Sequence, residues 1–343
     1  MDSVLKNKNE TWRANPPNLH GVPSEKAEYR QLCSQEKSTP LFSRDWWLDA
    51  AVGPENWQVV LAKINGNIVG ALPLFAKQRY GMTVIQQPPL TPVLGPWIKS
   101  NAKASHSRLG DEQRIMQLLI ENLPNFDHFR LTWNKGLSNW LPFYWSGFSQ
   151  TTEYTYVIPA LNDLDSLWKS FSGARRKHCT QGFEKYGLRV QEDHSIDHLL
   201  ELHKMSIGKR GASQSFDDDC LRRIDAACVQ HNCRKIEIVV DQGGRRCAGT
   251  YTVWDENCAY ALIIGSDPEM RHTDAASFCQ WAAIKSSAKI APKYDFLGNM
   301  NPSIEPYVRS YGTEQIPIFT IMKTPSRLLR LRQGIKTVFA LNS

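Results

Sequence analysis

The feature that most constrains the fold of this chain is an internal repeat. Two segments, one beginning at Trp57 and the other at Ile236, each predict three consecutive β-strands. A glycine-bearing turn joins the first two strands in both copies, at Asn65-Gly66 and at Gln242-Gly243-Gly244. Because short turns connect antiparallel strands, each copy predicts an antiparallel meander.

The elements that follow each meander also agree. An amphipathic helix is predicted over residues 111–123 in the first copy and 273–289 in the second. A further strand follows at 127–134 or 293–299, and helices precede both meanders. This order predicts an α+β fold with a mixed, mostly antiparallel sheet flanked by helices in each half. Two unrelated α+β domains could share the order by chance, and the sequence leaves that alternative open.

A domain boundary is predicted in the segment TTEYTYVIPALND, residues 151–163, where a strand-like run meets Pro159 and a polar helix start. The first domain is therefore expected at 1–157 and the second at 158–323. Residues 324–343 include the basic stretch RLLRLRQGIK. This stretch predicts a C-terminal helix that packs back on the body of the protein.

The composition is that of a globular protein with a moderate positive charge. Hydrophobic residues make up 41% of the chain, which is enough to exclude disorder over its whole length. A net charge of +7 favours anionic partners but is small for a dedicated nucleic-acid-binding protein, and no DNA partner is expected. The first residues lack the apolar core of a secretory signal, and no apolar run reaches the roughly 18 residues of a membrane span. A cytoplasmic location is therefore expected.

The eight cysteines give no signal of a metal or redox site. None of them forms a CxxC pair, so reduced thiols are expected. Cys228, His231 and Cys233 lie close together, but a structural zinc site needs four ligands and no second pair follows at a suitable spacing. We therefore predict no metal.

Five segments form motifs that occur in a characteristic order. They are PLFSRDWWLDA, QPPLTPVLGPW, WKSFSGARRKHCTQGFEKYGLRV, ELHKMSIGKRG and KYDFLGNMNPSIEPYVRSYGTEQIPIF. In this order they resemble the FemABX-like aminoacyl and acyl transferases, over a span from about Pro40 to Lys323. The resemblance implies two tandem GNAT-like domains, with the active cleft in the second.

The resemblance also implies a reaction. Members of this family transfer an aminoacyl or acyl group to an amine, usually of a precursor for peptidoglycan or polysaccharide in the cell envelope. The expected acceptor is a small-molecule or lipid-linked glycan or peptide, and the donor is aminoacyl-tRNA, so no bound cofactor is expected. Peripheral contact with a membrane stays open. Two other functions stay open as well: an acyl-CoA-dependent N-acetyltransferase, and a non-catalytic module that binds glycan or RNA.

The loop that would hold coenzyme A is altered in the second half. In GNAT enzymes this loop reads [QR]-x-x-G-x-[GA], so that bare backbone amides at a helix N-terminus hold the pyrophosphate. Here Asp274 occupies the glycine position, where its carboxylate would repel a phosphate. Binding of coenzyme A is therefore disfavoured, and Arg271 and Thr273 are cofactor contacts only if acyl-CoA is the donor.

Amide formation makes two chemical demands on the candidate catalytic residues. A Lys-type amine has a pKa near 10.4, so its deprotonation at neutral pH costs roughly 4 kcal/mol and needs a proton acceptor. Asp295 and Glu305 are the expected acceptors, with Asp255 and Asp267 as further options. A fixed donor at the developing oxyanion is typically worth about 3 kcal/mol. By the resemblance, Arg309 takes the place of a lysine that faces the donor. A surface arginine on a helix is the competing interpretation, and the sequence leaves both open.

The remaining candidates are expected to bind substrate. Arg175 and Arg176 are candidate phosphate contacts for a nucleotide or a tRNA end, although such clusters are often solvated faces. Lys99 lies where the family commonly carries an aspartate, which puts a nucleotide-linked muropeptide acceptor in doubt. The full expected set is Arg175, Arg176, Arg210, Trp46, Trp97, Lys99, Asn299 and Tyr311. Core packing is the competing interpretation of the aromatic members.

Overall fold

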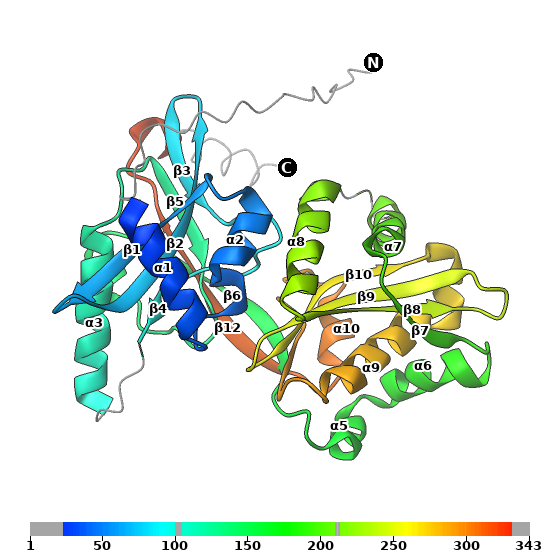
Figure 1. Cartoon of the computed structure of the whole chain (residues 1–343). Coiled ribbons are helices and arrows are strands. Elements are labelled where there is room, and N and C mark those ends of the chain that lie inside the picture. The colour runs from blue at the N-terminus through cyan, green and yellow to red at the C-terminus, as the bar shows by residue number, and fades with distance from the viewer. Residues whose placement is uncertain (1–22, 100–104, 210, 212, 299, 331–343) are drawn as a thin grey trace.

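The computed structural model describes residues 23–99, 105–209, 211, 213–298 and 300–330. In this part of the chain, twelve strands form one continuous sheet. Its strand order is β1-β2-β3-β5-β12-β6-β11-β10-β9-β8-β7, and β4 pairs with β2 beside this path. Helices flank the sheet in both halves of the molecule (Figure 1). The expected α+β class is confirmed.

The first half follows the predicted order of elements. Its elements are α1 (Pro23–Gln35), η1 (Leu41–Ser43), α2 (Asp45–Val52), β1 (Trp57–Ile64), β2 (Asn67–Arg79), β3 (Met82–Gln86), β4 (Trp97–Ile98), α3 (Ser105–Glu121), β5 (His128–Thr132), α4 (Leu141–Trp145) and β6 (Ser149–Ile158). Strands β1 to β3 are the antiparallel meander that the first copy of the repeat predicts. Its tight turn at Asn65 and Gly66 has positive φ angles at both residues, which glycine adopts without strain.

The second half repeats the same order after additional helices. Its elements are α5 (Leu164–Ser170), α6 (Gly173–Glu184), β7 (Arg189–Asp193), α7 (Ile196–Gly208), α8 (Asp218–Gln230), β8 (Arg234–Val240), β9 (Arg246–Trp254), β10 (Ala259–Ser266), η2 (Pro268–Thr273), α9 (Ala275–Ser287), β11 (Tyr294–Asp295), α10 (Glu305–Arg309) and β12 (Glu314–Lys323). Strands β8 to β10 form the second antiparallel meander. In each half the strand that follows the helix after the meander, β5 after α3 or β11 after α9, pairs parallel with the last strand of the meander.

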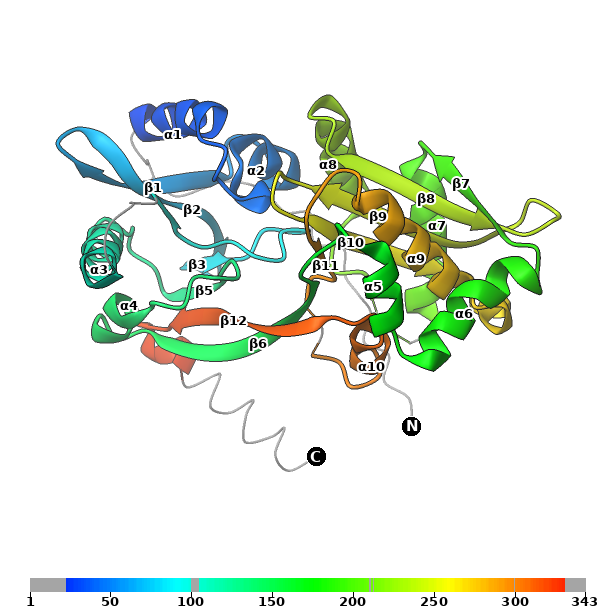
Figure 2. The same cartoon turned by 90° about the horizontal axis from the view of Figure 1, so that it is seen from below.

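The last strand of each half pairs with the other half. Strand β12, from the end of the chain, pairs antiparallel with β5, and β6 pairs antiparallel with β11. The two long strands also pair with each other, from Glu314 opposite Val157 to Met322 opposite Ser149. Figures 1 and 2 show β6 and β12 side by side, running from one half into the other. The two halves therefore share one sheet, and the expected division at residue 157 stays a prediction.

A second contact joins the halves through helices α2 and α8 (Figure 1). Trp47, on α2, is fully buried in one cluster with Leu221 and Ile224 of α8. Trp46 stacks on His231, with ring centroids 4.2 Å apart and ring planes 16° apart. The α2–α8 contact therefore adds to the shared sheet in fixing one half relative to the other, because close-packed side chains resist sliding.

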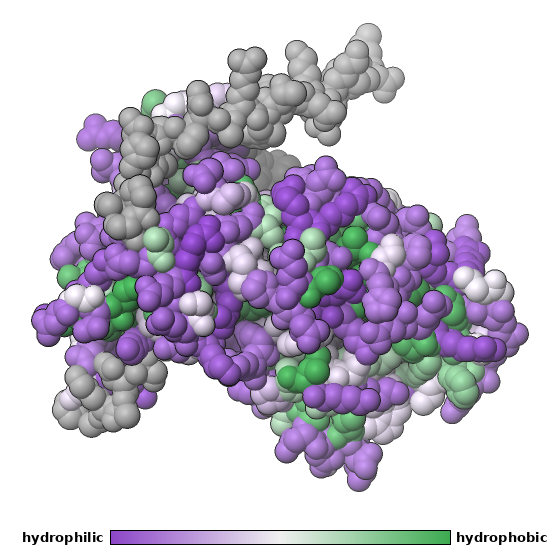
Figure 3. Space-filling view, in the orientation of Figure 1, coloured by the Kyte–Doolittle hydropathy of each residue, from purple (hydrophilic) through white to green (hydrophobic). Residues whose placement is uncertain are grey.

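The molecular surface is largely polar. The face shown in Figure 3 is mostly hydrophilic, with its hydrophobic residues in separate groups. Within the described ranges, none of the helices has both the length and the apolar character that crossing a bilayer requires. Residues 327–330 begin a helix after β12, and the rest of the basic C-terminal helix expected at 324–343 lies outside the described residues.

Helix α7 rests directly on the sheet at a pair of glycines. Gly265 on β10 lies opposite Gly249 on β9. A Cβ atom added to Gly265 would lie 2.6 Å from the backbone nitrogen of His203 and 2.7 Å from the carbonyl carbon of Leu202. Neither backbone atom can move without shifting the helix, so this position accepts glycine alone.

We expect the Gly265→Ala variant to lower the free energy of unfolding by about 1–3 kcal/mol, because overpacking displaces α7. The matched control is Gly110→Ala in α3, where an added Cβ meets no described atom within 4 Å. Alanine favours a helix over glycine, so this control should raise stability by up to about 1 kcal/mol. Urea denaturation measures both changes, and equal midpoints for Gly265→Ala and the unmodified protein would contradict the packing described.

Candidate active site at the junction of the two halves

A cavity of about 380 Å³ lies where the two halves meet on the shared sheet. Its wall combines residues from both halves of the chain. They are Ser38, Pro40, Pro92, Val93, Thr132, Asn134, Lys135, Glu153, Tyr154 and Thr155 from the first half, and Asp255, Asn257, Tyr260, Asp295, Leu297, Gly298, Met300 and Ile318 from the second. Cavities of this size that combine apolar walls with a few polar groups are typical of small-molecule sites.

A row of polar side chains crosses the sheet beneath this cavity. The hydroxyl groups of Thr132 on β5 and Thr320 on β12 lie 2.8 Å apart. The Thr320 hydroxyl donates a 2.8 Å hydrogen bond to Oε1 of Glu153 on β6. Both threonines are buried, and burying polar groups costs free energy unless they are hydrogen-bonded. The three neighbouring strands therefore present one connected polar network to the cavity.

The row continues from β6 to β11. Thr155 lies two residues beyond Glu153, so both side chains point to the same face of the sheet. Its hydroxyl donates to Oδ1 of Asp295, which is only 3% exposed. The same oxygen accepts a 2.9 Å bond from the backbone N–H of Leu297. One oxygen of the buried carboxylate is thus held by two neutral donors.

The loop after β11 has the backbone conformation that this arrangement needs. Leu297 and Gly298 have φ angles of 57° and 76°. The N–H of Gly298 donates a 2.9 Å bond to Thr155 Oγ1, next to the bond from Leu297 to Asp295. Two successive N–H groups therefore point toward the end of the polar row, as in an anion-binding nest. A left-handed leucine costs roughly 1–3 kcal/mol, and such strain is often found at functional sites.

Lys135 completes the row from the other half of the chain. Its Nζ donates to Oδ2 of Asp295 at 2.5 Å and lies 3.3 Å from the sulfur of Cys258. Burial alone would lower the pKa of Lys135, but the nearby Asp295 and Cys258 outweigh burial, and the pKa is raised. Lys135 is therefore a cation at neutral pH. Burial raises the pKa of the Cys258 thiol to about 12, so the sulfur is uncharged.

Sequence reasoning missed Lys135 because the cleft was expected in the second half. The repeat contained a usable signal. Asn134 ends the predicted strand at 127–134 and Lys135 follows it, just as Asn299 ends the predicted counterpart at 293–299 and Met300 follows it. Equivalent strands of a shared sheet bring the residues at their ends to one place. The structure brings Lys135 and Met300 into the wall of one cavity.

Two further carboxylates lie in the cavity wall. The Asp255 side chain follows β9; its Oδ1 accepts bonds from the backbone nitrogens of Asn257 and Cys258 at 2.9 and 3.0 Å. Its Oδ2 accepts a 3.2 Å bond from the Tyr260 hydroxyl. Glu153 is paired through Oε1 with Arg130 at 3.1 Å. Oε2 of Glu153 has no hydrogen-bond partner among the described residues.

The expected catalytic residues do not all meet in this cavity. Asp295 lines it, whereas Arg309 and Glu305 lie on the short helix α10 and are absent from its wall. The Arg309 side chain is 64% exposed, and its Nε donates to Glu305 Oε1 at 2.8 Å. This hydrogen bond from Arg309 also lowers the pKa of Glu305. The two residues thus form a pair within one helix, and Glu305 Oε1 also accepts a 3.0 Å bond from the Tyr156 hydroxyl.

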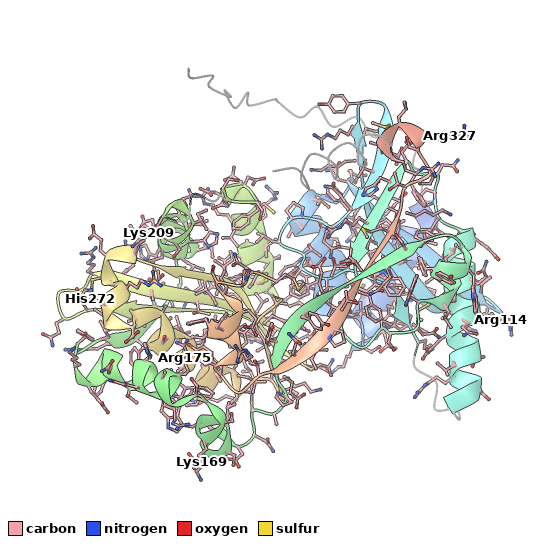
Figure 4. All side chains as sticks on the ribbon, turned by 180° about the vertical axis from the view of Figure 1, so that it is seen from behind. Arg114, Lys169, Arg175, Lys209, His272 and Arg327 are labelled. Carbon is pink, nitrogen blue, oxygen red and sulfur yellow. The ribbon has the colours of Figure 1, made fainter. Side chains whose placement is uncertain are left out.

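Arg175 is held against the first turn of α9 by its own chain. Its Nη1 donates to the hydroxyl of Ser277 in that turn, and its Nε donates to Ser310 Oγ at 2.8 Å. The guanidinium lies 4.2 Å from the ring centroid of Tyr307 and 4.7 Å from that of Tyr311. Figure 4 labels Arg175 within the second half. Tyr311, an expected substrate contact, is fully buried beneath it.

The residues before α9 are also engaged internally. Asp274 has a φ angle of 58°, and its Oδ1 lies 2.5 Å from Nδ1 of His178 on α6. Thr273 is buried, and its hydroxyl donates to the carbonyl of Met270 at 2.6 Å. Arg271 is exposed on η2. Side chains from α6 therefore cover the helix end at which a pyrophosphate would be expected.

The remaining expected substrate contacts occupy several separate places. Trp97 is buried and donates from Nε1 to Oγ of Ser38, which lines the cavity, at 3.0 Å. Arg176 donates to the carbonyls of Lys169 and Phe171 near the end of α5. Trp46 packs between the helices that join the halves, and Lys99 is exposed. Arg210 and Asn299 lie outside the described residues.

Comparisons with known proteins agree with this architecture. Residues 169–307 match a family model described as an acetyltransferase (GNAT) domain. The structure of FemX is similar with a TM-score of 0.60 at 13% identity, covering 86% of this chain and 95% of that one. The structure of L-PGS from Bacillus licheniformis is similar with a TM-score of 0.52 at 10% identity, covering 92% and 97%.

A third solved structure has the same tandem organisation. It is described as a tandem GNAT protein from the clavulanic acid biosynthesis pathway, with a TM-score of 0.50, 10% identity and coverage of 88% of this chain and 95% of that one. A search of curated protein sequences found no match. The resemblance that the sequence motifs carry is thereby confirmed at the level of the fold: this chain has two tandem GNAT-like units, and its fold is similar to that of FemX.

Proposed function

We propose that this protein transfers an aminoacyl or acyl group to an amine, and that the junction cavity is where the amide bond forms. The GNAT domain at residues 169–307 and the FemX-like fold support acyl transfer as the class of reaction. The observation that carries the choice of site is the polar row on the shared sheet. It brings a buried cation, Lys135, and a carboxylate with one unpartnered oxygen, Glu153, to a single cavity.

In the proposed reaction, each of these two residues answers one chemical demand. The neutral amine attacks the carbonyl carbon of the donor, and Glu153 accepts the proton that the new N–C bond releases. The ammonium of Lys135 stabilises the negative charge that develops on the carbonyl oxygen. The bond from carbon to the leaving oxygen or sulfur then breaks, and the leaving group takes the proton from Glu153. Asp295 acts through Lys135 as a positioning residue.

Aminoacyl-tRNA is the proposed donor, with no bound cofactor. A GNAT enzyme would hold a pyrophosphate at the N-terminal end of α9. Here Arg175 of α6 donates to Ser277 in the first turn of α9, and His178 of α6 is hydrogen-bonded to Asp274 just before it. This argues against acyl-CoA and against Arg271 and Thr273 as cofactor contacts. A cell-envelope precursor is the proposed acceptor, in line with the family resemblance. The proposed location of the transfer reaction is the cytoplasm.

Acetyl-CoA provides a direct check on the choice of donor. We expect titration of the protein with acetyl-CoA in a calorimeter to give no saturable heat at up to about 1 mM ligand, which limits any binding free energy to about −4 kcal/mol or weaker. Saturable binding of acetyl-CoA in the micromolar range would contradict the proposed donor and would support the N-acetyltransferase alternative.

The function itself is tested by reconstituted transfer. The protein is incubated with charged tRNA and amine acceptors, and the amide product is followed by mass spectrometry. We expect Glu153→Gln to lower the rate by about 100-fold or more, because it removes the proton acceptor. The control is Glu256→Gln, which removes an exposed carboxylate paired with Lys37 outside the cavity. Absence of turnover with tRNA and acyl-CoA donors alike would contradict the proposal and favour a binding module.

Arg309 separates this proposal from the alternative that the resemblance implies. Because Arg309 is exposed and paired within its own helix, we expect Arg309→Ala to change neither the transfer rate nor the melting temperature appreciably. Transfer assays and thermal unfolding measure the two quantities. A rate that collapses while the melting temperature stays unchanged would restore Arg309 as the residue facing the donor.

A further inference from the structure

Two of the eight cysteines meet at the C-terminal end of α8. Cys228 lies in the last turn of this helix, and Cys233 directly precedes β8. The backbone N–H of Cys233 donates a 3.0 Å bond to the carbonyl oxygen of Cys228, and the N–H of Asn232 donates a 3.1 Å bond to that of Val229. Asn232 has a φ angle of 49°. The two bonds and the left-handed residue form a Schellman motif, in which the side chains at the outer positions commonly pack against each other.

The two side chains that this motif brings together are both thiols. The side chain of Cys233 is hydrogen-bonded to that of Cys228, and its sulfur also lies 3.7 Å from the Cys228 carbonyl oxygen. The other six cysteines lie within the described ranges as well, and the hydrogen bonds found for their thiols involve backbone carbonyls or side chains of other types. The spacing of five residues is not a CxxC motif, so the sequence gave no signal of this pair.

The two thiols differ in their access to solvent. Cys228 is fully buried, and its hydrogen bond with Cys233, together with burial, raises its pKa, so that it is a neutral thiol at pH 7. Cys233 is 7% exposed, and residues 230–232 before it are exposed. Because helix ends fray, opening of this one turn uncovers Cys233 without opening the core. A disulfide begins with attack by an accessible thiolate, so the first step falls to Cys233.

We propose that Cys228 and Cys233 are a redox-active pair that forms a reversible disulfide when the protein meets a small-molecule disulfide such as oxidised glutathione. The Cys233 thiolate attacks one sulfur of the oxidant, a mixed disulfide forms, and the other half of the oxidant leaves as a thiol with the proton that Cys233 lost. Cys228 then loses its proton, attacks the sulfur of Cys233 and expels the second thiol. Two protein thiols are oxidised, and one oxidant disulfide is reduced.

The proposed bond lies next to the helix contact that joins the two halves. His231, which stacks on Trp46 of α2, is between the two cysteines in the chain. In the reduced protein, only the backbone bonds of the motif keep this turn closed. A disulfide excludes the open forms of the turn, since a cross-link restricts the unfolded ensemble. Oxidation therefore fastens the end of α8 against which α2 packs. The proposal goes beyond the transfer reaction and does not depend on it.

The test is oxidation of the full chain with glutathione, followed by mass spectrometry. After an acid quench, free thiols are blocked with one alkylating reagent, disulfides are reduced, and the released thiols are labelled with a second reagent of different mass. At equilibrium with about 5 mM oxidised glutathione, we expect Cys228 and Cys233 to carry mainly the second label and the other six cysteines mainly the first. Equal labelling of all eight cysteines, or absence of the second label from the pair, overturns the proposal.

Substitutions test the order of the two steps. In Cys228→Ala the second step is missing, so Cys233 should keep a bound glutathione. In Cys233→Ala no glutathione should join Cys228, because that thiol is fully buried. The matched control is Cys279→Ala, which removes another buried thiol, bonded to the Glu237 carbonyl at 3.3 Å, and it should leave oxidation of the pair unchanged. A glutathione adduct on Cys228 but none on Cys233 would overturn the proposed order.

The melting temperature of the unmodified chain gives a readout that needs no variant. The oxidised protein should melt about 2–5 °C higher than the reduced protein, and dithiothreitol should reverse the increase. The same treatment should leave the melting temperature of Cys233→Ala unchanged. A lower melting temperature on oxidation of the unmodified chain would show that the bond does not fit the folded turn, and it would overturn the proposal.

Discussion

Replacing Lys135 with methionine should lower the transfer rate by about 100-fold or more. Methionine keeps much of the length of the side chain but removes the ammonium that stabilises the oxyanion, and loss of one such donor typically costs about 3 kcal/mol of transition-state stabilisation. The measurement is the rate of amide formation by mass spectrometry at saturating donor and acceptor. The matched control is Lys37→Met, because Lys37 also pairs with a carboxylate of the other half, at 2.7 Å, but is 79% exposed and outside the cavity. Equal rates in the two variants would contradict the role of Lys135.

The stability of the same variants should behave differently from their activity. In Lys135→Met, Asp295 keeps its bonds from Thr155 and Leu297 but becomes a buried charge without a counter-ion, which typically costs about 3 kcal/mol or more. The double variant Lys135→Met with Asp295→Asn removes both charges and should recover most of that loss, since a neutral replacement of a buried pair is often close to neutral in stability. Urea denaturation of the two variants measures this recovery.

The double variant also tests whether Lys135 has a chemical role. It should remain as inactive as the single variant although its stability is restored. Recovery of both stability and transfer rate would show that Lys135 acts only to stabilise the junction.

The pKa of Lys135 is raised in the folded protein. The contribution of Lys135 to stability is therefore fully present below its usual pKa of about 10.4 and is lost as the pH rises through the higher folded-state value.

The repeat in the sequence predicted more of the fold than any single motif did. Alternation of apolar residues and the turns at Asn65-Gly66 and Gln242-Gly243-Gly244 were sufficient for both meanders, because these signals are local. The pairing of β12 with β5 could not be predicted from the sequence. A repeat gives the order of the strands, but equivalent last strands can pair within their own half or exchange, and the sequence pattern is the same in both cases.

The candidate site was predictable only in part for the same reason. Asp295 could be found because it is a carboxylate at the end of a strand, within the motif that begins KYDFLGN. Lys135 could not be singled out, because its significance arises from the exchange that brings the two halves together. Arg309 illustrates the converse, since the direction of a side chain on a five-residue helix depends on tertiary packing that no motif encodes. The arginine therefore points to solvent, where its partner is Glu305.

The central claim is that amide formation takes place in the cavity between the halves, on the sheet that they share. The most direct measurement is a crystal structure of the Glu153→Gln variant with its amine acceptor, because loss of the proton acceptor should trap that complex. The account predicts the amine nitrogen within hydrogen-bonding distance of residue 153, beside the ammonium of Lys135. An acceptor bound instead at the first turn of α9, beside Arg175 and Ser277, would contradict it.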